Sequence, residues 1–143
     1  MSIEIKNLEH VYSAGTPFEH KALNGINLSI PEGKVTAVIG QTGSGKSTLV
    51  QHLNGLLLPT AGSVDIAGYH IEAGSKLKNI TNLRKDVGLV FQFPEYQLFE
   101  ETIEKDIAFG PKNFGDTPEE AAQKARNIIS KVGLDESYLN RSP

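Results

Sequence analysis

Residues 40–47 are Gly40-Gln41-Thr42-Gly43-Ser44-Gly45-Lys46-Ser47, which matches G-x-x-x-x-G-K-[ST], the pattern of a phosphate-binding P-loop. An apolar run over residues 34–39 precedes the motif, and residues 47–53 after it have the composition of a helix. The motif binds phosphate where it joins a strand to a helix, and the flanks fit that context. Its glycines let backbone N–H groups close around an anion at the positive end of the helix dipole. The stretch therefore predicts nucleotide binding.

The motif assigns roles to individual side chains. We expect the Lys46 ammonium to contact the β- and γ-phosphates and the Ser47 hydroxyl to hold a magnesium ion. The alternative is a Gly/Ser-rich turn that contains a lysine by chance, which the flanking strand and helix disfavour. The candidate nucleotide-binding residues of this segment are Gly40, Gln41, Thr42, Gly43, Ser44, Gly45, Lys46, Ser47 and Thr48.

Length and composition indicate one globular domain, with 143 residues of which 38% are apolar and 22% charged. With a net charge of −3, the chain lacks the excess of basic residues that nucleic-acid-binding proteins usually carry, so we expect no nucleic-acid partner. Because the chain has no cysteine, disulfides, thiol nucleophiles and cysteine zinc sites are excluded. No apolar run approaches the roughly 18 residues of a membrane span, so any membrane role is expected to be peripheral.

Apolar periodicity and turn residues predict strands followed by helices, the pattern of an α+β lobe. Strands are expected at residues 3–8, 23–30, 34–39, 62–68 and 87–91. Helices are expected at residues 47–53, at 80–85, from about 102 to a stop at Gly110-Pro111, and at 117–132.

The strongest helix signal begins at Thr117. Thr117 is expected as the N-cap, Pro118 at the first helical position, and Glu120 as the third residue of a capping box. An apolar stripe then leads to Gly133, which is expected to cap the C-terminus. The stripe consists of Ala121, Ala125, Ile128, Ile129 and Val132.

Other segments point to one family. Residues 87–92, Val-Gly-Leu-Val-Phe-Gln, resemble the Q-loop of the ATP-binding-cassette (ABC) ATPases, and residues 62–68 lie where that family has an antiparallel β-subdomain. Tyr12 stands at the position of the family's adenine-stacking aromatic, and residues 22–28 are similar to the strand that leads toward the P-loop. The resemblance covers almost the whole chain. It implies an α/β fold, an ABC ATPase nucleotide-binding domain with a RecA-like core plus an antiparallel β-subdomain, and ATP and Mg²⁺ as ligands.

Longer segments narrow the resemblance. Residues 15–19, 51–57 and 92–102 are similar to the A-prime ATPase subunit of energy-coupling factor (ECF) transporters, which import vitamins and some transition-metal ions. The resemblance implies a second ATPase subunit, a transmembrane coupling subunit and a substrate-binding membrane subunit as partners. It also implies a peripheral location at the cytoplasmic face of the cell membrane and, for the complete subunit, ATP hydrolysis coupled to transport.

One part of the family pattern is missing. In the family, the segment that resembles residues 139–143 leads into the LSGGQ signature, the Walker B strand with its catalytic Glu, and the switch His. This sequence contains no run of four apolar residues followed by Asp-Glu. We therefore expect residues 1–143 to be the N-terminal part of one ABC ATPase domain, with the β-subdomain, P-loop, Q-loop and the start of the helical subdomain. This part alone is expected to bind nucleotide without hydrolysing it.

The resemblance also assigns roles outside the P-loop. Gln92 is expected to contact the magnesium ion and the attacking water, so Lys46 and Gln92 are the catalytic candidates and Ser47 and Gln92 the metal ligands. The alternative for Gln92 is an ordinary polar residue at the end of a strand. Tyr12 is expected to stack on adenine, and its alternative is a partly buried core aromatic.

Three further groups have structural alternatives. Residues 93–99 are expected to form a groove wall for a short helix of the membrane subunit, or else to pack internally beneath a loop. The acidic group Glu100, Glu101 and Glu104 is expected to be a solvated helix start rather than a metal site. The histidines show no ligand spacing and are expected to be structural or exposed: His10, His20, His52 and His70.

Two other functions stay open on the sequence. A small-molecule P-loop kinase would need a lid with arginines, whereas Arg84, Arg126 and Arg141 are widely scattered. The N-terminal half of a DNA-repair or chromosome-structure ATPase would need long heptads after the Q-loop. The helix expected at residues 117–132 is instead capped after about four turns.

Overall fold

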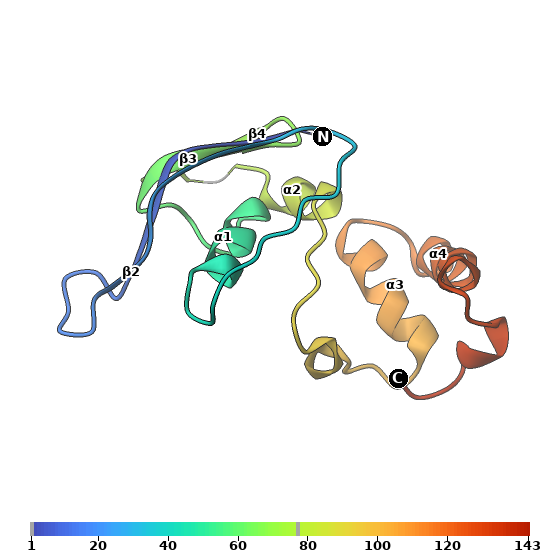
Figure 1. Ribbon diagram of the computed structural model, residues 1–143. Coiled ribbons are helices and arrows are strands. Elements are labelled where there is room, and N and C mark those ends of the chain that lie inside the picture. The colour runs from blue at the N-terminus through green and yellow to red at the C-terminus, as the bar shows by residue number, and fades with distance from the viewer. Residues whose placement is uncertain (1, 77) are drawn as a thin grey trace. The chain divides into compact units, whose positions relative to one another are not determined.

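The computed structural model describes residues 2–76 and 78–143 (Figure 1). The chain divides into two compact units, residues 1–89 and residues 90–143. The first unit contains a β-sheet with short helices, and the second is helical. No helix within the described residues is long and apolar enough to cross a membrane.

The sheet of the first unit is antiparallel throughout and has the strand order β2-β1-β3-β4. Its strands are β1 (Ile3–Tyr12), β2 (His20–Ile30), β3 (Ala61–Ile66) and β4 (Tyr69–Glu72). The strands predicted at residues 3–8, 23–30 and 62–68 are confirmed. Strand β4, which the sequence analysis did not separate, completes a hairpin with β3 in which Val64 pairs with Ile71.

A bulge in β1 explains the spacing of its buried residues. Ile5 and Leu8 are both buried although they are three residues apart, which a regular strand would place on opposite faces. The pairing of β1 with β2 shifts register between these residues, and Asn7 has a φ of 47°. The extra residue returns Leu8 to the buried face of the sheet.

Two helices cover one side of the sheet, as Figure 1 shows. Helix α1 spans Lys46–Leu53 and helix α2 spans Ile80–Asp86, which confirms the helices predicted there. Leu83 of α2 is fully buried, and Leu49 and Leu53 of α1 pack against the same core. The buried core consists of Ile5, Leu8, Leu23, Val64, Ile66, Ile71 and Leu83.

Two strand predictions are wrong. Residues 34–39 and 87–91 form no strand, and in the first segment Val35 and Ile39 are 102% and 90% exposed. An apolar, β-branched run becomes a core strand only when neighbouring strands pair with its edges and other elements cover its faces. Among the described residues, no strand pairs with either segment. The described sheet is therefore the antiparallel one, without the parallel strands of a RecA-like core.

The second unit is built around a pair of packed helices. Helix α3 spans Ile103–Asn113 and helix α4 spans Pro118–Ile129, and the Glu104 carboxylate accepts a hydrogen bond of 2.9 Å from Arg126 Nε. Short 3₁₀ turns complete the unit: η1 (Pro94–Gln97), η2 (Ser130–Val132) and η3 (Glu136–Tyr138).

Helix α3 does not stop at Gly110-Pro111 as predicted, but continues to Asn113. Proline lacks the N–H that would bond one turn back, yet it leaves the carbonyl groups before it free to accept from later residues. The Phe114 N–H donates to the carbonyls of Gly110 and Pro111, at 3.2 and 3.1 Å. These bonds close a further turn after the proline.

Helix α4 begins at the predicted capping box. The Glu120 N–H donates to Thr117 Oγ1 at 3.2 Å, and the Thr117 N–H donates to Glu120 Oε2 at 2.8 Å. Of the predicted stripe, Ala121, Ala125 and Ile129 are buried, whereas Ile128 and Val132 are exposed. Ile128 lies about 100° around the helix from Ile129, and Val132 belongs to the 3₁₀ turn, whose different period rotates it away.

Candidate nucleotide-binding site

The P-loop runs over residues 40–45 and enters α1 through Gly45. Gly45 has φ 88° and ψ 4°, and its carbonyl accepts the N–H of Leu49 at 2.8 Å as the helix begins. A Cβ at Gly45 would lie 2.8 Å from the carbonyl oxygen of Ala22 on β2. Only glycine therefore combines this left-handed conformation with this close approach to the strand.

The side chain of Lys46 folds back over the loop. Its Nζ donates to the carbonyl oxygens of Gly40 at 2.8 Å and Gln41 at 2.7 Å, and lies 3.5 Å from Ser44 Oγ. The Ser44 N–H donates to the Gln41 carbonyl at 3.2 Å, which closes a turn inside the loop. The ammonium is thus held within the curve of the loop, and residues 40–44 are exposed to solvent.

The next two residues of α1 face different surroundings. Ser47 is exposed in the first helical turn, whereas Thr48 is buried. The Thr48 hydroxyl lies 3.2 Å from the hydroxyl of Tyr12 at the end of β1, and the Tyr12 side chain is 37% exposed. The structure therefore brings Tyr12 into direct contact with the P-loop helix while part of the residue stays accessible.

Two histidines lie beside Tyr12 and Thr48. The Nδ1 of His52 lies 2.7 Å from the Thr48 carbonyl oxygen, and its Nε2 lies 3.2 Å from Nδ1 of His10. The His10 and Tyr12 rings meet edge to face with centroids 4.5 Å apart. Both histidines are buried, in agreement with the structural role predicted for them.

Burial is the main cause that lowers the pKa of His52 below its ordinary value of 6.5. The contact of His10 and His52 with Tyr12 and Thr48 was not predicted from the sequence. The signal was present, because residues two apart share a face of a strand and residues four apart share a face of a helix.

Gln92 lies in an exposed bend of the second unit, two residues before η1 begins. Lys46 and Ser47 belong to the first unit. The joint action of Gln92 with these residues on a metal ion therefore stays a prediction.

The aromatic stretch after Gln92 is largely exposed. Tyr96 is 85% exposed and its ring centroid lies 6.0 Å from that of Phe93. Phe99 makes an edge-to-face contact with Phe109 of α3, with centroids 4.8 Å apart. Part of the stretch thus packs internally, and its role in docking a membrane subunit stays a prediction.

The acidic residues at the start of α3 have cationic partners. Glu101 accepts from Lys105 Nζ at 2.6 Å, one helical turn away, and Glu104 pairs with Arg126. Within residues 2–76 and 78–143, no group of three or more His, Asp and Glu side chains is arranged to hold a metal ion.

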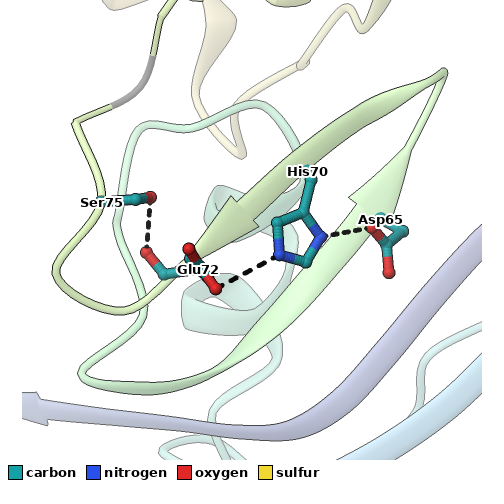
Figure 2. A network of polar contacts seen from close by, with 4 residues as sticks. All are labelled: Asp65, His70, Glu72 and Ser75. Carbon is teal, nitrogen blue, oxygen red and sulfur yellow. Dashed lines mark hydrogen bonds and ion pairs between the residues drawn. The ribbon is translucent and has the colours of Figure 1, made fainter.

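A separate polar network lies on the β3–β4 hairpin (Figure 2). His70 on β4 sits between two carboxylates, with Nδ1 2.5 Å from Asp65 Oδ1 and Nε2 3.5 Å from Glu72 Oε2. The Ser75 hydroxyl donates to the Glu72 carbonyl at 2.8 Å. The hydrogen bond to Asp65, followed by that to Glu72, raises the pKa of His70. The network contains none of the candidate nucleotide-binding residues.

The chain as a whole is similar to known proteins of one family. Residues 23–142 match the protein family described as ABC transporter. The chain is 58% identical over its whole length to the energy-coupling factor transporter ATP-binding protein EcfA2 of Spiroplasma kunkelii. It is 55% identical over its whole length to the protein of that name from Ligilactobacillus salivarius. The chain covers 47% and 50% of these proteins, so it spans about half the length of the curated relatives it matches.

Solved structures show the same similarity. The ATP-binding cassette MJ0796, solved as a dimer in a post-hydrolysis state bound to ADP and Pi, aligns with a TM-score of 0.80 and 27% identity. The alignment covers 99% of this chain and 61% of the cassette. The cbiO1 protein of Clostridium perfringens, part of the ABC transporter complex cbiONQ, aligns with a TM-score of 0.74 and 36% identity. That alignment covers 96% of this chain and 52% of cbiO1.

Proposed function

The chain belongs to the ABC transporter family, and from this premise we propose that residues 40–48 bind the phosphates of ATP. The observation that carries the proposal is the position of Lys46, whose ammonium lies 2.8 and 2.7 Å from the carbonyl oxygens of Gly40 and Gln41. A phosphate entering the loop would meet this charge together with the exposed backbone of residues 40–44. Tyr12, next to the same helix, would stack on the adenine.

The residues present fit a magnesium ion as the second ligand. Ser47 offers a hydroxyl oxygen from the exposed first turn of α1, beside the loop that would hold the phosphates. Magnesium prefers oxygen ligands and is commonly bound through one or two protein groups together with substrate phosphates. Ser47, with Gln92 as a second protein ligand, would hold the ion. When bound, it would neutralise charge on the β- and γ-phosphates.

For the whole protein, the proposed function is that of an ATPase subunit of an ECF-type importer. The support is the 58% identity to an energy-coupling factor transporter ATP-binding protein over the full length of this chain. In this role residues 1–143 form the N-terminal part of a single ATPase domain. The partners would be a second ATPase subunit, a transmembrane coupling subunit and a substrate-binding membrane subunit at the cytoplasmic face of the membrane. The imported solute would be a vitamin or a metal ion.

Nucleotide titration tests the proposed site. Lys46→Ala should weaken the binding of Mg²⁺–ATP by roughly 10- to 100-fold, the value of a lost hydrogen bond to a charged group of about 1.5–3 kcal/mol. Lys34→Ala, which removes an exposed lysine outside the loop, is the matched control and should leave the affinity unchanged. Isothermal titration calorimetry gives both dissociation constants. Equal binding by the Lys46→Ala variant and the parent would contradict the proposal.

A turnover assay separates binding from hydrolysis. Residues 1–143 tested alone should bind ATP and release no phosphate, because the sequence contains no Asp-Glu pair after an apolar strand to supply a general base. Phosphate release that disappears in the Lys46→Ala variant would show that these residues hydrolyse ATP by themselves.

A further inference from the structure

Four residues form a closed ring of contacts between strand β1 and the P-loop helix α1. The Tyr12 hydroxyl contacts the Thr48 hydroxyl, and the Thr48 carbonyl contacts His52. His52 in turn contacts His10, and the His10 ring meets the ring of Tyr12. Two members come from β1 and two from α1, so the ring joins the strand to the helix at one place. His10, Thr48 and His52 are buried, and only Tyr12 reaches the surface.

The hydrogen-bond partners determine which nitrogens carry protons. A carbonyl oxygen can only accept, so His52 Nδ1, 2.7 Å from the Thr48 carbonyl, carries a hydrogen. His10 Nδ1 lies 3.1 Å from the Leu58 carbonyl and must also carry one. His52 Nε2 lies 3.2 Å from the same nitrogen, so it is assigned as the acceptor, a neutral imidazole nitrogen. Both rings are thus assigned as Nδ1–H tautomers.

This arrangement fixes the Tyr12 ring from two sides. Its hydroxyl contacts the Thr48 hydroxyl on α1. The His10 ring contacts the Tyr12 ring at an interplanar angle of 76°. An aromatic side chain has few torsions, and two contacts of this kind leave it little freedom. The His52 imidazole supports both contacts, because it holds His10 through Nε2 and the Thr48 backbone through Nδ1.

We propose that His52 and His10 are positioning residues of the nucleotide site, which hold the Tyr12 ring in the orientation that stacks on the base of bound nucleotide. The proposal rests on the proposed ATP-binding function. It assigns the two histidines no contact with the ligand: they act on the base through Tyr12. The ring shares Thr48 with the proposed phosphate-binding segment, whereas Lys46, which provides the charge for the phosphates, lies outside it.

A proton on His52 Nε2 would remove the hydrogen bond that this nitrogen accepts from His10 Nδ1–H. A charged His52 carries a hydrogen on both ring nitrogens and can only donate. The groups that face His52 are His10 and the carbonyls of Thr48 and Leu58, and no carboxylate is among the causes that shift its pKa. Burial is the largest cause that lowers the pKa of His52, and the nearby His10 lowers it further, so His52 is neutral at pH 8 and becomes charged only below its ordinary value of 6.5.

The test compares two probes on the full chain, Mg²⁺–ATP and Mg²⁺–tripolyphosphate. Tripolyphosphate carries the phosphates without a base, so the ratio of the two affinities isolates the stacking contribution. Base stacking on an aromatic side chain is worth roughly tenfold or more in affinity. His52→Ala should reduce the preference for ATP over tripolyphosphate by about that factor and leave tripolyphosphate binding unchanged. Tyr12→Ala should give the same loss, and the double variant no further loss.

The unaltered protein provides a second readout, which does not depend on the folding of a variant with a buried substitution. Its preference for ATP over tripolyphosphate should fall between pH 8 and the acid pH at which nitrogen-15 spectra show the His52 ring charged, and the preference of the Tyr12→Ala variant should not change with pH. His70→Gln, which removes an exposed histidine outside the ring, should keep the profile of the parent. Nitrogen-15 spectra of the imidazoles should show both rings as Nδ1–H tautomers at pH 8.

The outcomes separate the two proposals. A preference in the parent that does not change as His52 becomes charged, or an unchanged preference in His52→Ala, would overturn the positioning role. Equal weakening of ATP and tripolyphosphate in His52→Ala would also overturn it, because the ring would then support the phosphate loop rather than Tyr12. If Lys46→Ala weakens neither probe, the nucleotide site itself is wrong.

Discussion

At the scale of single residues, His52 and His70 show how surroundings move the pKa of one side chain in opposite directions. His52 is fully buried, and loss of water around the ring disfavours its charged form. His70 is exposed between Asp65 and Glu72, and hydrogen bonds to these carboxylates favour its charged form. In acid, His52 therefore lowers the free energy of unfolding, whereas His70 raises it.

His70 gives a prediction for the pH dependence of stability. Its pKa in the folded chain is raised above the ordinary value of 6.5, so its contribution is fully present below pH 6.5 and is lost as pH rises through the folded pKa. Asp65→Asn should lower the pKa of His70 more than Glu72→Gln, because the bond to Asp65 is the larger cause. Proton NMR titration of the imidazole measures both shifts. A His70 titration unaffected by Asp65→Asn would contradict this account.

At the scale of elements, the bulge of β1 and the start of β3 depend on each other. Gly62 lies opposite the bulge with a φ of 77°, and a Cβ placed on it would lie 2.2 Å from the carbonyl oxygen of Asn7. The carbonyl oxygen of Lys6 would be 2.4 Å away. Because both obstacles are backbone atoms, neither can move aside without shifting the pairing of the two strands. The bulge that returns Leu8 to the core therefore requires glycine at this position.

Gly62→Ala should destabilise the first unit by roughly 3 kcal/mol, from backbone clash and left-handed strain together. Gly68→Ala is the matched control, because Gly68 has a similar φ of 81° and open space around it. It should cost only the conformational part, about 1 kcal/mol. Urea unfolding followed by circular dichroism gives both values. Equal losses for the two variants would show that the contact with β1 contributes nothing.

At the scale of the whole molecule, several large apolar side chains of the kind that usually lies in a core are exposed to solvent. Val35 and Ile39 in the first unit are 102% and 90% exposed, and Val90 in the second is 84% exposed. Exposed apolar side chains promote association where they lie together. The segments that carry it are those predicted as core strands, at residues 34–39 and 87–91.

Residues 1–143 alone should self-associate. The apparent mass in light scattering coupled to size-exclusion chromatography is expected to rise with protein concentration, because exposed apolar segments can pair between chains. The double substitution Val35→Lys with Ile39→Lys should reduce this rise. Val132→Lys, at an exposed apolar residue of the η2 turn, is the control and should change it little. A monomer at every concentration tested would contradict the prediction.

The sequence by itself determined the P-loop motif, three of the four described strands of the sheet and the capped helix α4. These features depend on neighbours in the chain: glycine spacing, alternation of apolar residues, and the reciprocal bonds of Thr117 and Glu120. Its predictions failed for residues 34–39 and 87–91, where apolar character alone favoured a strand.

Only the tertiary structure decided whether residues 34–39 and 87–91 pair as strands, because the strands they would pair with come from elsewhere in the chain. It also decided that His10 and Tyr12 on β1 meet Thr48 and His52 on α1. Spacing along each element assigns the two pairs to one face, but it does not bring the faces together. Packing of the helix against the sheet does so, and it turns two ordinary histidines into a support for the nucleotide site proposed here.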